Sequence, residues 1–280
     1  MLGEGPLWSP AERKLYWLDL TAPAIWRFDP VSGRNEPVGA ALDGYIGGMV
    51  ARASGGFVLV DHRGMYTLDV ATGRVERLGV LTPNRPDTVF NDAKCDRMGA
   101  LWTGTKHTGE RDPVGALFRL GADARIDKID DGIICANGPA FSPDGGTAYF
   151  ADSNTHRIHR YDVDTAAGAV GPRLPFATVD PTDGEPDGMT VDAEGCLWVA
   201  LWGGWRVRRY MPGGRIEREI RLPVPQPTSP AFGGADMRTL FVTSARRDLD
   251  GAALAEAPLS GSLFAIEADM GGLIEPRFAG

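Results

Sequence analysis

The chain has 280 residues, 43% of them hydrophobic, and a formal net charge of −8. The hydrophobic content is sufficient for a folded core, while the negative charge argues against nucleic acid or an anionic membrane as a partner. Three cysteines without a CxxC pair, no secretory leader and no apolar run of ~20 residues predict a soluble, cytoplasmic protein with reduced thiols.

Strong strand signals recur in chain order at intervals of 42–49 residues. Each follows a turn rich in Gly, Pro, Asp or Ser, and a further short strand pattern comes after it. The signals are Leu15 to Asp19, Phe57 to Asp61, Leu101 to Thr105, Ala148 to Asp152, Leu197 to Leu201 and Leu240 to Ser244. A repeat of this length with strand periodicity predicts an all-β, six-bladed β-propeller that residues 1–280 form as one domain.

The first repeat begins almost at Met1, so few residues remain for a strand that would close the ring. An open sheet edge is a liability, and propellers usually close by pairing strands from both chain ends. We therefore expect either a shortened start or closure through the C-terminal segment from Ile274 to Phe278.

The first strand of every blade lines the central channel, so equivalent positions meet there. These positions are Glu4, Ile46, Asn91, Asn137, Asp187 and Ser229. Two carboxylates and two amides in a narrow channel would repel or remain unpaired unless a cation lay between them. Such an oxygen set suits Ca²⁺, Mg²⁺ or Mn²⁺ and predicts a central metal-binding channel, with a water-filled polar channel as the alternative.

Strand direction places several loops at the end of the channel where these residues lie, and a pocket is expected there. The loops are Lys106 to Pro113, Ser153 to His156, Trp202 to Trp205, Arg246 to Pro258, and the connections around Tyr45, Thr82 to Val89 and Thr182 to Glu185. Tyr45, His107 and Trp202 are candidate substrate-binding residues. The alternatives are that His107 is a loop histidine outside any functional site, and that Trp202 only fills the hydrophobic space between two blades.

Five segments carry a recognisable pattern: LGEGPLW, FNDAKCDRMGALWTGT, NGPAFSPDGGTAYFADS, PDGMTVDAEGCLWVALWGG and SPAFGGADMRTLFVTSAR. In this order, and over essentially the whole chain, they resemble the SMP-30/gluconolactonase/LRE-like family. The resemblance implies a propeller that hydrolyses lactones with one divalent metal, Ca²⁺ first, with Zn²⁺, Mn²⁺, Mg²⁺ or Fe²⁺ as alternatives. It also implies Glu4, Asn137 and Asp187 as metal ligands, Asp187 as the catalytic base, and Asn91 as a substrate contact.

One departure from the family concerns the substrate side. Many members have an arginine two residues before the asparagine matched by Asn91, and here that position is Val89. A glutamate of the following loop has no clear equivalent, although Glu110 lies nearby. Replacement donors could come from Lys106, His107, Arg246 or Arg247. Val89→Arg is expected to improve turnover of aldonolactones relative to simple aliphatic lactones.

The expected reaction is hydrolysis of a lactone, preferably a sugar (aldono-) lactone, with the cation polarising the carbonyl and Asp187 activating water. A role for Asp187 as metal ligand alone stays open. The alternatives are a metal-dependent esterase or phosphotriesterase-like propeller on a less polar substrate, and a non-catalytic binding propeller with a structural ion. The expected partner is a small-molecule lactone, and the chain is expected to be a monomer or weak homo-oligomer.

Overall fold

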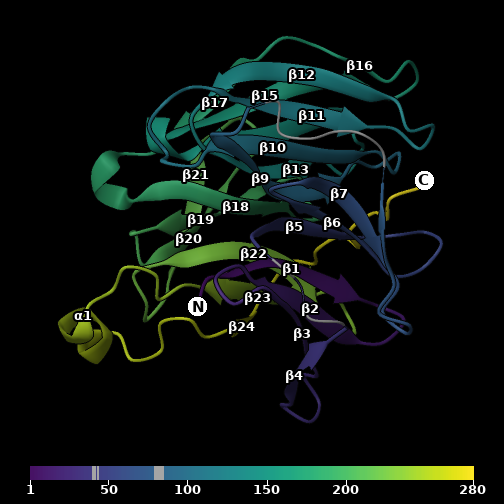
Figure 1. The fold of residues 1–280 in the computed structure, drawn as a ribbon. Helices are drawn as coiled ribbons and strands as arrows, with labels where there is room; N and C mark the ends of the chain where they lie inside the picture. Colours follow the sequence, from purple (N-terminus) through teal and green to yellow (C-terminus); the bar gives the residue numbers. More distant parts are fainter. Residues whose placement is uncertain (40–41, 43, 79–84) are drawn as a thin grey trace.

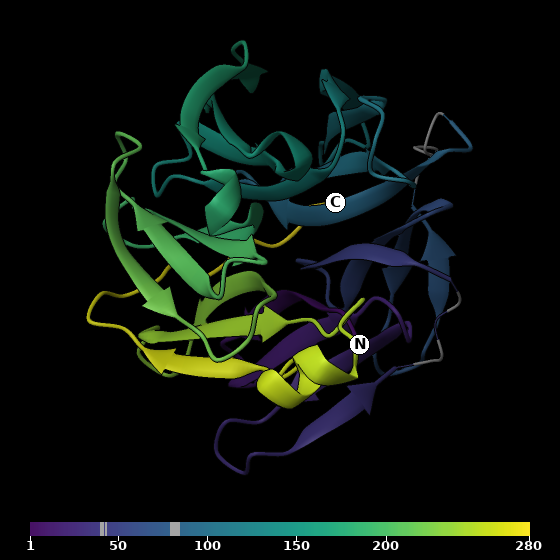
Figure 2. The same ribbon diagram turned by 90° about the vertical axis from the view of Figure 1, so that its left-hand side faces the viewer.

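The computed structural model describes residues 1–280 except 40–41, 43 and 79–84. Its strands form six antiparallel sheets that surround one axis, as the face-on view of Figure 2 shows. The predicted all-β, six-bladed propeller is confirmed. Part of the predicted loop from Thr82 to Val89 lies outside the described residues.

The first three blades have four strands each. Blade 1 contains β1 (Gly3–Ser9), β2 (Lys14–Asp19), β3 (Ala24–Phe28) and β4 (Asn35–Val38). Blade 2 contains β5 (Ile46–Ala51), β6 (Phe57–Asp61), β7 (Gly64–Leu68) and β8 (Val75–Arg77). Blade 3 contains β9 (Thr88–Cys95), β10 (Leu101–His107), β11 (Gly115–Leu120) and β12 (Ile126–Ile133).

The last three blades differ in strand number. Blade 4 contains β13 (Ala136–Phe141), β14 (Thr147–Asp152), β15 (Arg157–Asp164), β16 (Ala169–Val170) and β17 (Leu174–Thr178). Blade 5 contains β18 (Glu185–Val191), β19 (Leu197–Trp202), β20 (Arg206–Tyr210) and β21 (Ile216–Arg221). Blade 6 contains β22 (Pro227–Gly233), β23 (Thr239–Ser244) and β24 (Phe264–Glu267).

In the part of the chain that the structure describes, helical structure is confined to short segments in loops: η1 (Ser153–Thr155), η2 (Pro181–Asp183) and α1 (Gly251–Glu256). Among the described residues, no helix has both the length and the apolar character that crossing a bilayer would require. In Figure 1, α1 and the N-terminus lie toward one face of the propeller and the C-terminus toward the other.

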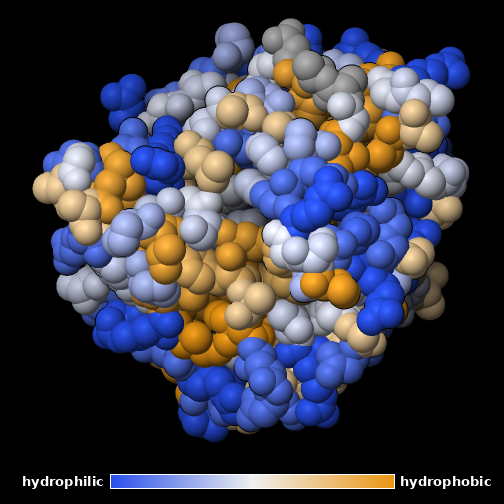
Figure 3. Space-filling view, turned by 90° about the horizontal axis from the view of Figure 1, so that it is seen from below, coloured by the Kyte–Doolittle hydropathy of each residue, from blue (hydrophilic) through white to orange (hydrophobic). Residues whose placement is uncertain are grey.

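Apolar side chains pack between neighbouring blades and leave the axis to other residues. Trp102 and Phe150, from blades 3 and 4, belong to one buried cluster, and Trp198 and Phe232, from blades 5 and 6, to another. Full burial of one such side chain contributes roughly 1.5–3 kcal/mol to stability. The side of the molecule that carries blades 1 and 6 also shows an apolar area bordered by hydrophilic residues (Figure 3). The core therefore sits in the seams between blades, and the channel is free for polar side chains.

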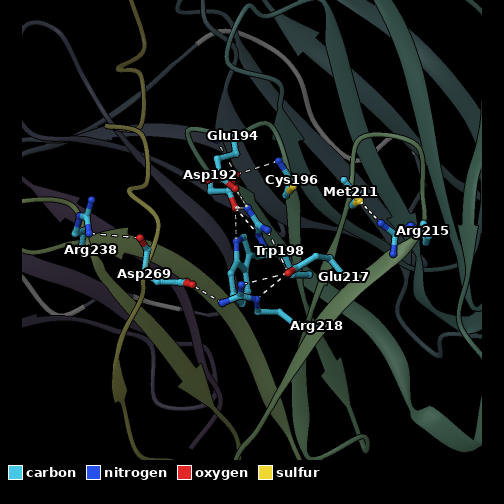
Figure 4. A network of polar contacts seen from close by, with 11 residues as sticks. Asp192, Glu194, Cys196, Trp198, Met211, Arg215, Glu217, Arg218, Arg238 and Asp269 are labelled. Carbon is cyan, nitrogen blue, oxygen red and sulfur yellow. Dashed lines mark hydrogen bonds and ion pairs between the residues drawn. The ribbon is translucent and has the colours of Figure 1, made fainter.

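Two blades are fastened internally by the same buried group of an aspartate, a tryptophan and an arginine. They are the blade 3 clamp (Asp96, Trp102, Arg119) and the blade 5 clamp (Asp192, Trp198, Arg209). In blade 5, Asp192 Oδ2 accepts hydrogen bonds from Trp198 Nε1 at 2.9 Å and Arg209 Nε at 2.8 Å (Figure 4). The same contacts in blade 3 measure 2.9 and 3.0 Å. Each clamp ties the turn before the second strand to the third strand of its blade.

The ring closes where β1 packs beside β22, the innermost strands of blades 1 and 6. Leu2 forms an antiparallel bridge with Ala245, and Thr228 Oγ1 donates a hydrogen bond to the carbonyl of Gly3. Blade 6 has three strands within the described residues, whereas blade 1 is complete. The expectation of a shortened start stays a prediction, because β1 is the inner strand of blade 1 and no described segment adds a fourth strand to blade 6.

The C-terminal segment, residues 268–280, departs from the expectation that it closes the ring. It leaves blade 6 and crosses the face opposite the N-terminus, where Gly272 bridges Asp192 of blade 5 and Phe278 bridges Arg52 of blade 2. Between them, Glu275 Oε1 lies 2.9 Å from Lys94 Nζ of blade 3. Because it contacts blades 2, 3 and 5, the segment covers one end of the channel, but it adds no strand at the seam between blades 1 and 6.

Candidate functional site

Four of the predicted channel residues line a single cavity at the end where the innermost strands begin. Glu4 of β1, Asn91 of β9, Asn137 of β13 and Asp187 of β18 all face this cavity, which measures about 170 Å³. Three of the four side chains are less than one-tenth exposed. The innermost strands thus bring together residues that are as far apart in the sequence as Glu4 and Asp187.

Local backbone irregularities turn these side chains toward the axis. The strand register shifts directly after Glu4 and after Asn137, and such bulges re-aim a side chain. Gly138 has φ +83°, a conformation that favours glycine. At Gly188, beside Asp187, an added Cβ would lie 2.3 Å from Ser229 Oγ, so only glycine fits. The EG, NG and DG pairs of the sequence therefore have a structural reason.

A chain of hydrogen bonds fixes the amides of the site. Tyr45 Oη donates to Asn91 Oδ1 at 2.6 Å, and Asn91 Nδ2 donates to Asn137 Oδ1 at 2.9 Å. Asn137 Nδ2 donates to Ser153 Oγ at 2.7 Å, and that hydroxyl donates to the carbonyl of Pro186 at 2.6 Å. Burial raises the pKa of Tyr45 to about 12, so its hydroxyl keeps the proton that it donates. The network runs from blade 2 to blade 5 and orients both amides.

Among the described residues, Glu4 and Asp187 lack side-chain partners of this kind, and each accepts a hydrogen bond only from the backbone amide of the next residue, Gly5 and Gly188. Burial raises the pKa of Glu4 well above its usual value, and repulsion from Asp187 and Asp92 raises it further. The pKa of Asp187 is also raised, first by burial and then by Asp92. The ion pairs formed by described residues include neither Glu4 nor Asp187. Both acids are therefore costly to ionise unless a positive charge approaches them.

Asp92 is a third channel acid, and sequence reasoning missed it. Strand alternation turns the residue after Asn91 away from the channel, but Asp92 has φ +54° and sits at a register shift of β9. It lines a smaller cavity of about 20 Å³ deeper in the channel, beside Ser229 and Glu275. Burial raises its pKa to about 7. No local sequence pattern signalled this orientation, because strand alternation predicts the opposite one.

The walls of the larger cavity include two of the three predicted pocket residues. Tyr45 and Trp202 line it, together with Lys106, Glu110 and Glu185. Other polar lining residues are Cys135, Ser153, Asn154, Arg247 and Asp248. Lys106 and Arg247, which the sequence offered as replacement donors, are thus both at the cavity.

His107 is not brought to the cavity, contrary to its predicted role. Its Nδ1 accepts hydrogen bonds from the backbone amides of Arg111 at 3.3 Å and Asp112 at 3.2 Å. The ring is buried within the loop that follows β10, where it organises the backbone. Val89 is also absent from the cavity lining; it pairs with Lys106 across strands β9 and β10.

The donor set fits a hard divalent cation. Glu4 and Asp187 supply carboxylate oxygens, and Asn137 Oδ1 keeps a second lone pair after accepting from Asn91. The described residues contain no group of three or more His, Cys, Asp and Glu side chains arranged for a metal, so the amide is needed as the third protein ligand. A cation here would relieve the repulsion that raises the pKa values of the two acids.

The fold and this arrangement define a class, a six-bladed propeller with acids and amides converging on its axis. The chain belongs to the family described as SMP-30/Gluconolactonase/LRE-like region, which matches residues 2–246.

Individual relatives are similar over the full chain. The 6-deoxy-6-sulfogluconolactonase of Pseudomonas putida is 37% identical over 280 residues, 100% of this chain and 96% of the relative. The L-arabinolactonase of Azospirillum brasilense is 35% identical over 291 residues, 100% of this chain and 92% of the relative. The crystal structure of a calcium-binding protein, regucalcin, from Agrobacterium tumefaciens has a TM-score of 0.93 at 30% identity, covering 99% and 93% of the two chains.

Proposed function

We propose that this protein is a lactonase, a hydrolase that opens the ring of a sugar lactone with the help of one divalent metal ion. Similarity to proteins named lactonases extends over the whole chain, which supports the reaction class. The single observation that carries the metal dependence is the pair of buried acids, Glu4 and Asp187, which face an accessible cavity and form no ion pair with any described residue, although Lys106 lies in the same cavity.

Glu4, Asn137 and Asp187 are the residues that would hold the metal. When bound, the metal would act as a Lewis acid that polarises the lactone carbonyl and stabilises negative charge on its oxygen. Ca²⁺ is our first choice because the donors are all oxygen and because a calcium-binding protein shares the fold closely. Mg²⁺, Mn²⁺, Zn²⁺ and Fe²⁺ are the ions to test beside it.

Asp187 is assigned the role of base. Water attacks the carbonyl carbon while Asp187 accepts its proton, the ring C–O bond breaks, and the proton passes to the released alkoxide. Asp187 must be ionised for this step, and a neighbouring positive charge favours the ionised form. The only product is the open-chain hydroxy acid, so the lactone and water are the only reactants.

Asn91, Tyr45 and Trp202 would orient the substrate. Asn91 and Tyr45 are held by the hydrogen-bond network, and Trp202 offers an apolar surface to the sugar ring. The remaining walls are rich in charged and amide groups, which favours a hydroxylated lactone over the less polar ester of the alternative reading. His107 is not given a substrate contact.

We also propose a cytoplasmic, single-domain protein that acts as a monomer or weak homo-oligomer on a small molecule. The three cysteines are buried and free, which suits a reducing compartment. The sheets of all six blades share one axis, which supports treating residues 1–280 as one domain.

The test is a lactone panel assayed with a pH indicator. Metal is removed from the purified protein by chelation, and Ca²⁺, Mg²⁺, Mn²⁺, Zn²⁺ or Fe²⁺ is added back singly. Hydrolysis of an aldonolactone should disappear on chelation and return with at least one ion. Failure to hydrolyse any lactone with any of these ions would contradict the proposal.

A further inference from the structure

The cavity contains one deeply buried cation among the described residues, Lys106 at the end of β10. The residue is 8% exposed and lines the cavity beside Tyr45 and Glu110. Its Nζ lies 2.8 Å from Glu110 Oε1 and 5.6 Å from the centroid of the Tyr45 ring. Burial alone would lower the pKa of Lys106, but Tyr45, Cys135 and Glu110 raise it above its usual value. The ammonium is therefore charged at neutral pH.

Glu110, the partner of Lys106, is more exposed, and contacts to its backbone position it. It lies four residues after Lys106, in the turn that His107 organises, and Asn154 Nδ2 donates to its backbone carbonyl at 3.3 Å. An ammonium has three N–H donors, of which Glu110 takes one and Tyr45 faces another. At least one donor of Lys106, and the second carboxylate oxygen of Glu110, remain for a ligand in the cavity.

We infer that the Lys106–Glu110 pair is the specificity-determining element of this site, which binds the ring hydroxyls of an uncharged polyhydroxylated lactone. The inference rests on the proposed lactonase function. A hydroxyl both accepts and donates a hydrogen bond, so it matches an ammonium and a carboxylate offered together. An anionic substituent would be attracted by Lys106 but repelled by Glu110, so the pair would contribute much less to its binding affinity.

The position of the pair explains how the chain functions without an arginine at residue 89. Lys106 stands directly opposite Val89 in the β9–β10 ladder, so the cation has moved to the neighbouring strand. Asn91 lies two residues from Val89 on the same face of β9. Hydroxyls that contact Asn91 are therefore within the region that the Lys106 side chain borders.

The experiment compares two metal-loaded variants on two substrates, glucono-1,5-lactone and unsubstituted δ-valerolactone. Lys106→Met should raise KM for gluconolactone about 10- to 100-fold, the effect of losing a hydrogen bond to a charged group, with kcat changed less than about threefold. Kinetics on valerolactone should stay within about twofold of the wild type. Glu110→Gln, which leaves the ammonium in place, should give the same selective loss at a smaller size.

The matched control is Lys128→Met. Lys128 is an exposed lysine of the same blade, and like Lys106 it forms an ion pair with an acid, here Asp131 at 2.7 Å. The KM and kcat values of this control should match those of the wild type on both substrates. Binding of 1,5-anhydroglucitol, a polyhydroxylated ring without a carbonyl, gives a readout independent of catalysis and should weaken only in the Lys106 and Glu110 variants.

Equal losses on both lactones in the Lys106→Met and Glu110→Gln variants, or unchanged binding of 1,5-anhydroglucitol, would overturn the inference. If the wild type hydrolyses neither lactone, the proposed function fails, and the binding experiment still decides the role of the pair.

Discussion

The blade 5 clamp and the channel axis both bury carboxylates, but they surround them with opposite neighbours. Asp192 in the clamp is 0% exposed, and its oxygens accept hydrogen bonds from Trp198, Arg209 and two backbone amides. Glu194 and Glu217 extend the network by pairing with the same arginine, at 2.6 and 3.1 Å (Figure 4). Every charge in this region has a partner.

At the axis, Asp187 is 7% exposed, and its charged neighbours are the acids Asp92 and Glu185 and the cation Lys106, with which it forms no ion pair. Burial in a low dielectric is costly for a charge unless partners compensate. A paired acid therefore contributes to stability, whereas a cluster of unpaired acids lowers it and is retained for another reason, such as binding a cation. The difference between the regions separates structural from functional carboxylates without reference to the family.

The largest expected effect is on activity at the axis. Asp187→Asn keeps the shape of the side chain but removes the base and the negative charge of one metal ligand, so kcat/KM for an aldonolactone should fall by at least about 100-fold. The control is Asp123→Asn on an exposed turn, which should leave kcat/KM unchanged. A variant at Asp187 that retains a third of the activity would refute the assignment.

The clamp should give the largest effect on stability. Asp192→Asn leaves Arg209 buried without its full counter-charge and should lower the free energy of unfolding by about 3 kcal/mol. Urea denaturation measures this value, and kcat/KM should remain near that of the wild type. A loss below about 1 kcal/mol would mean that the clamp is not the structural element described here.

A pH titration of metal-free protein sharpens the comparison. The pKa of Asp92 rises from its usual 3.8 to about 7 in the folded protein, so the folded state binds more protons than the unfolded state between these values. Stability should therefore fall as pH rises from 4 to 7, by up to about 1.4 kcal/mol per pH unit for each such carboxyl. Asp92→Asn should flatten the slope, measured by thermal or urea unfolding. A steeper fall of stability with pH in Asp92→Asn than in the wild type would contradict the expected direction of the Asp92 contribution.

The smallest expected effect concerns Val89. In the wild type, Val89→Arg would place a second cation opposite Lys106, so the gain in turnover of aldonolactones over aliphatic lactones should be slight. In the Lys106→Met background, Val89→Arg should raise the ratio of kcat/KM for aldonolactones to kcat/KM for aliphatic lactones several-fold, back toward the wild-type ratio. No recovery would mean that residue 89 does not reach the substrate.

Much of this picture was predictable because the repeat is local. The spacing of strand signals predicted six blades, and counting back from each signal predicted that Glu4, Asn91, Asn137 and Asp187 face the channel. These predictions need only the alternation of side chains along a strand and the similar arrangement of every blade around the axis. The clamps were not predicted, although each forms within one blade.

Other features depended on contacts that no local pattern encodes. Asp92 faces the channel because of a left-handed backbone and a bulge, against strand alternation. His107 turns into its own loop because two backbone amides need an acceptor. The C-terminal segment crosses the axis because Glu275 finds Lys94, a partner far away in the sequence.

The most direct test of the central claim is thermal unfolding of metal-free wild type, Asp187→Asn and Asp192→Asn proteins with and without each divalent ion. At least one ion should raise the Tm of the wild type and of Asp192→Asn, because it binds only the folded state. The same ion should not raise the Tm of Asp187→Asn. An unchanged Tm for the wild type with every ion, or an equal rise in Asp187→Asn, would contradict the claim that the channel acids hold a cation.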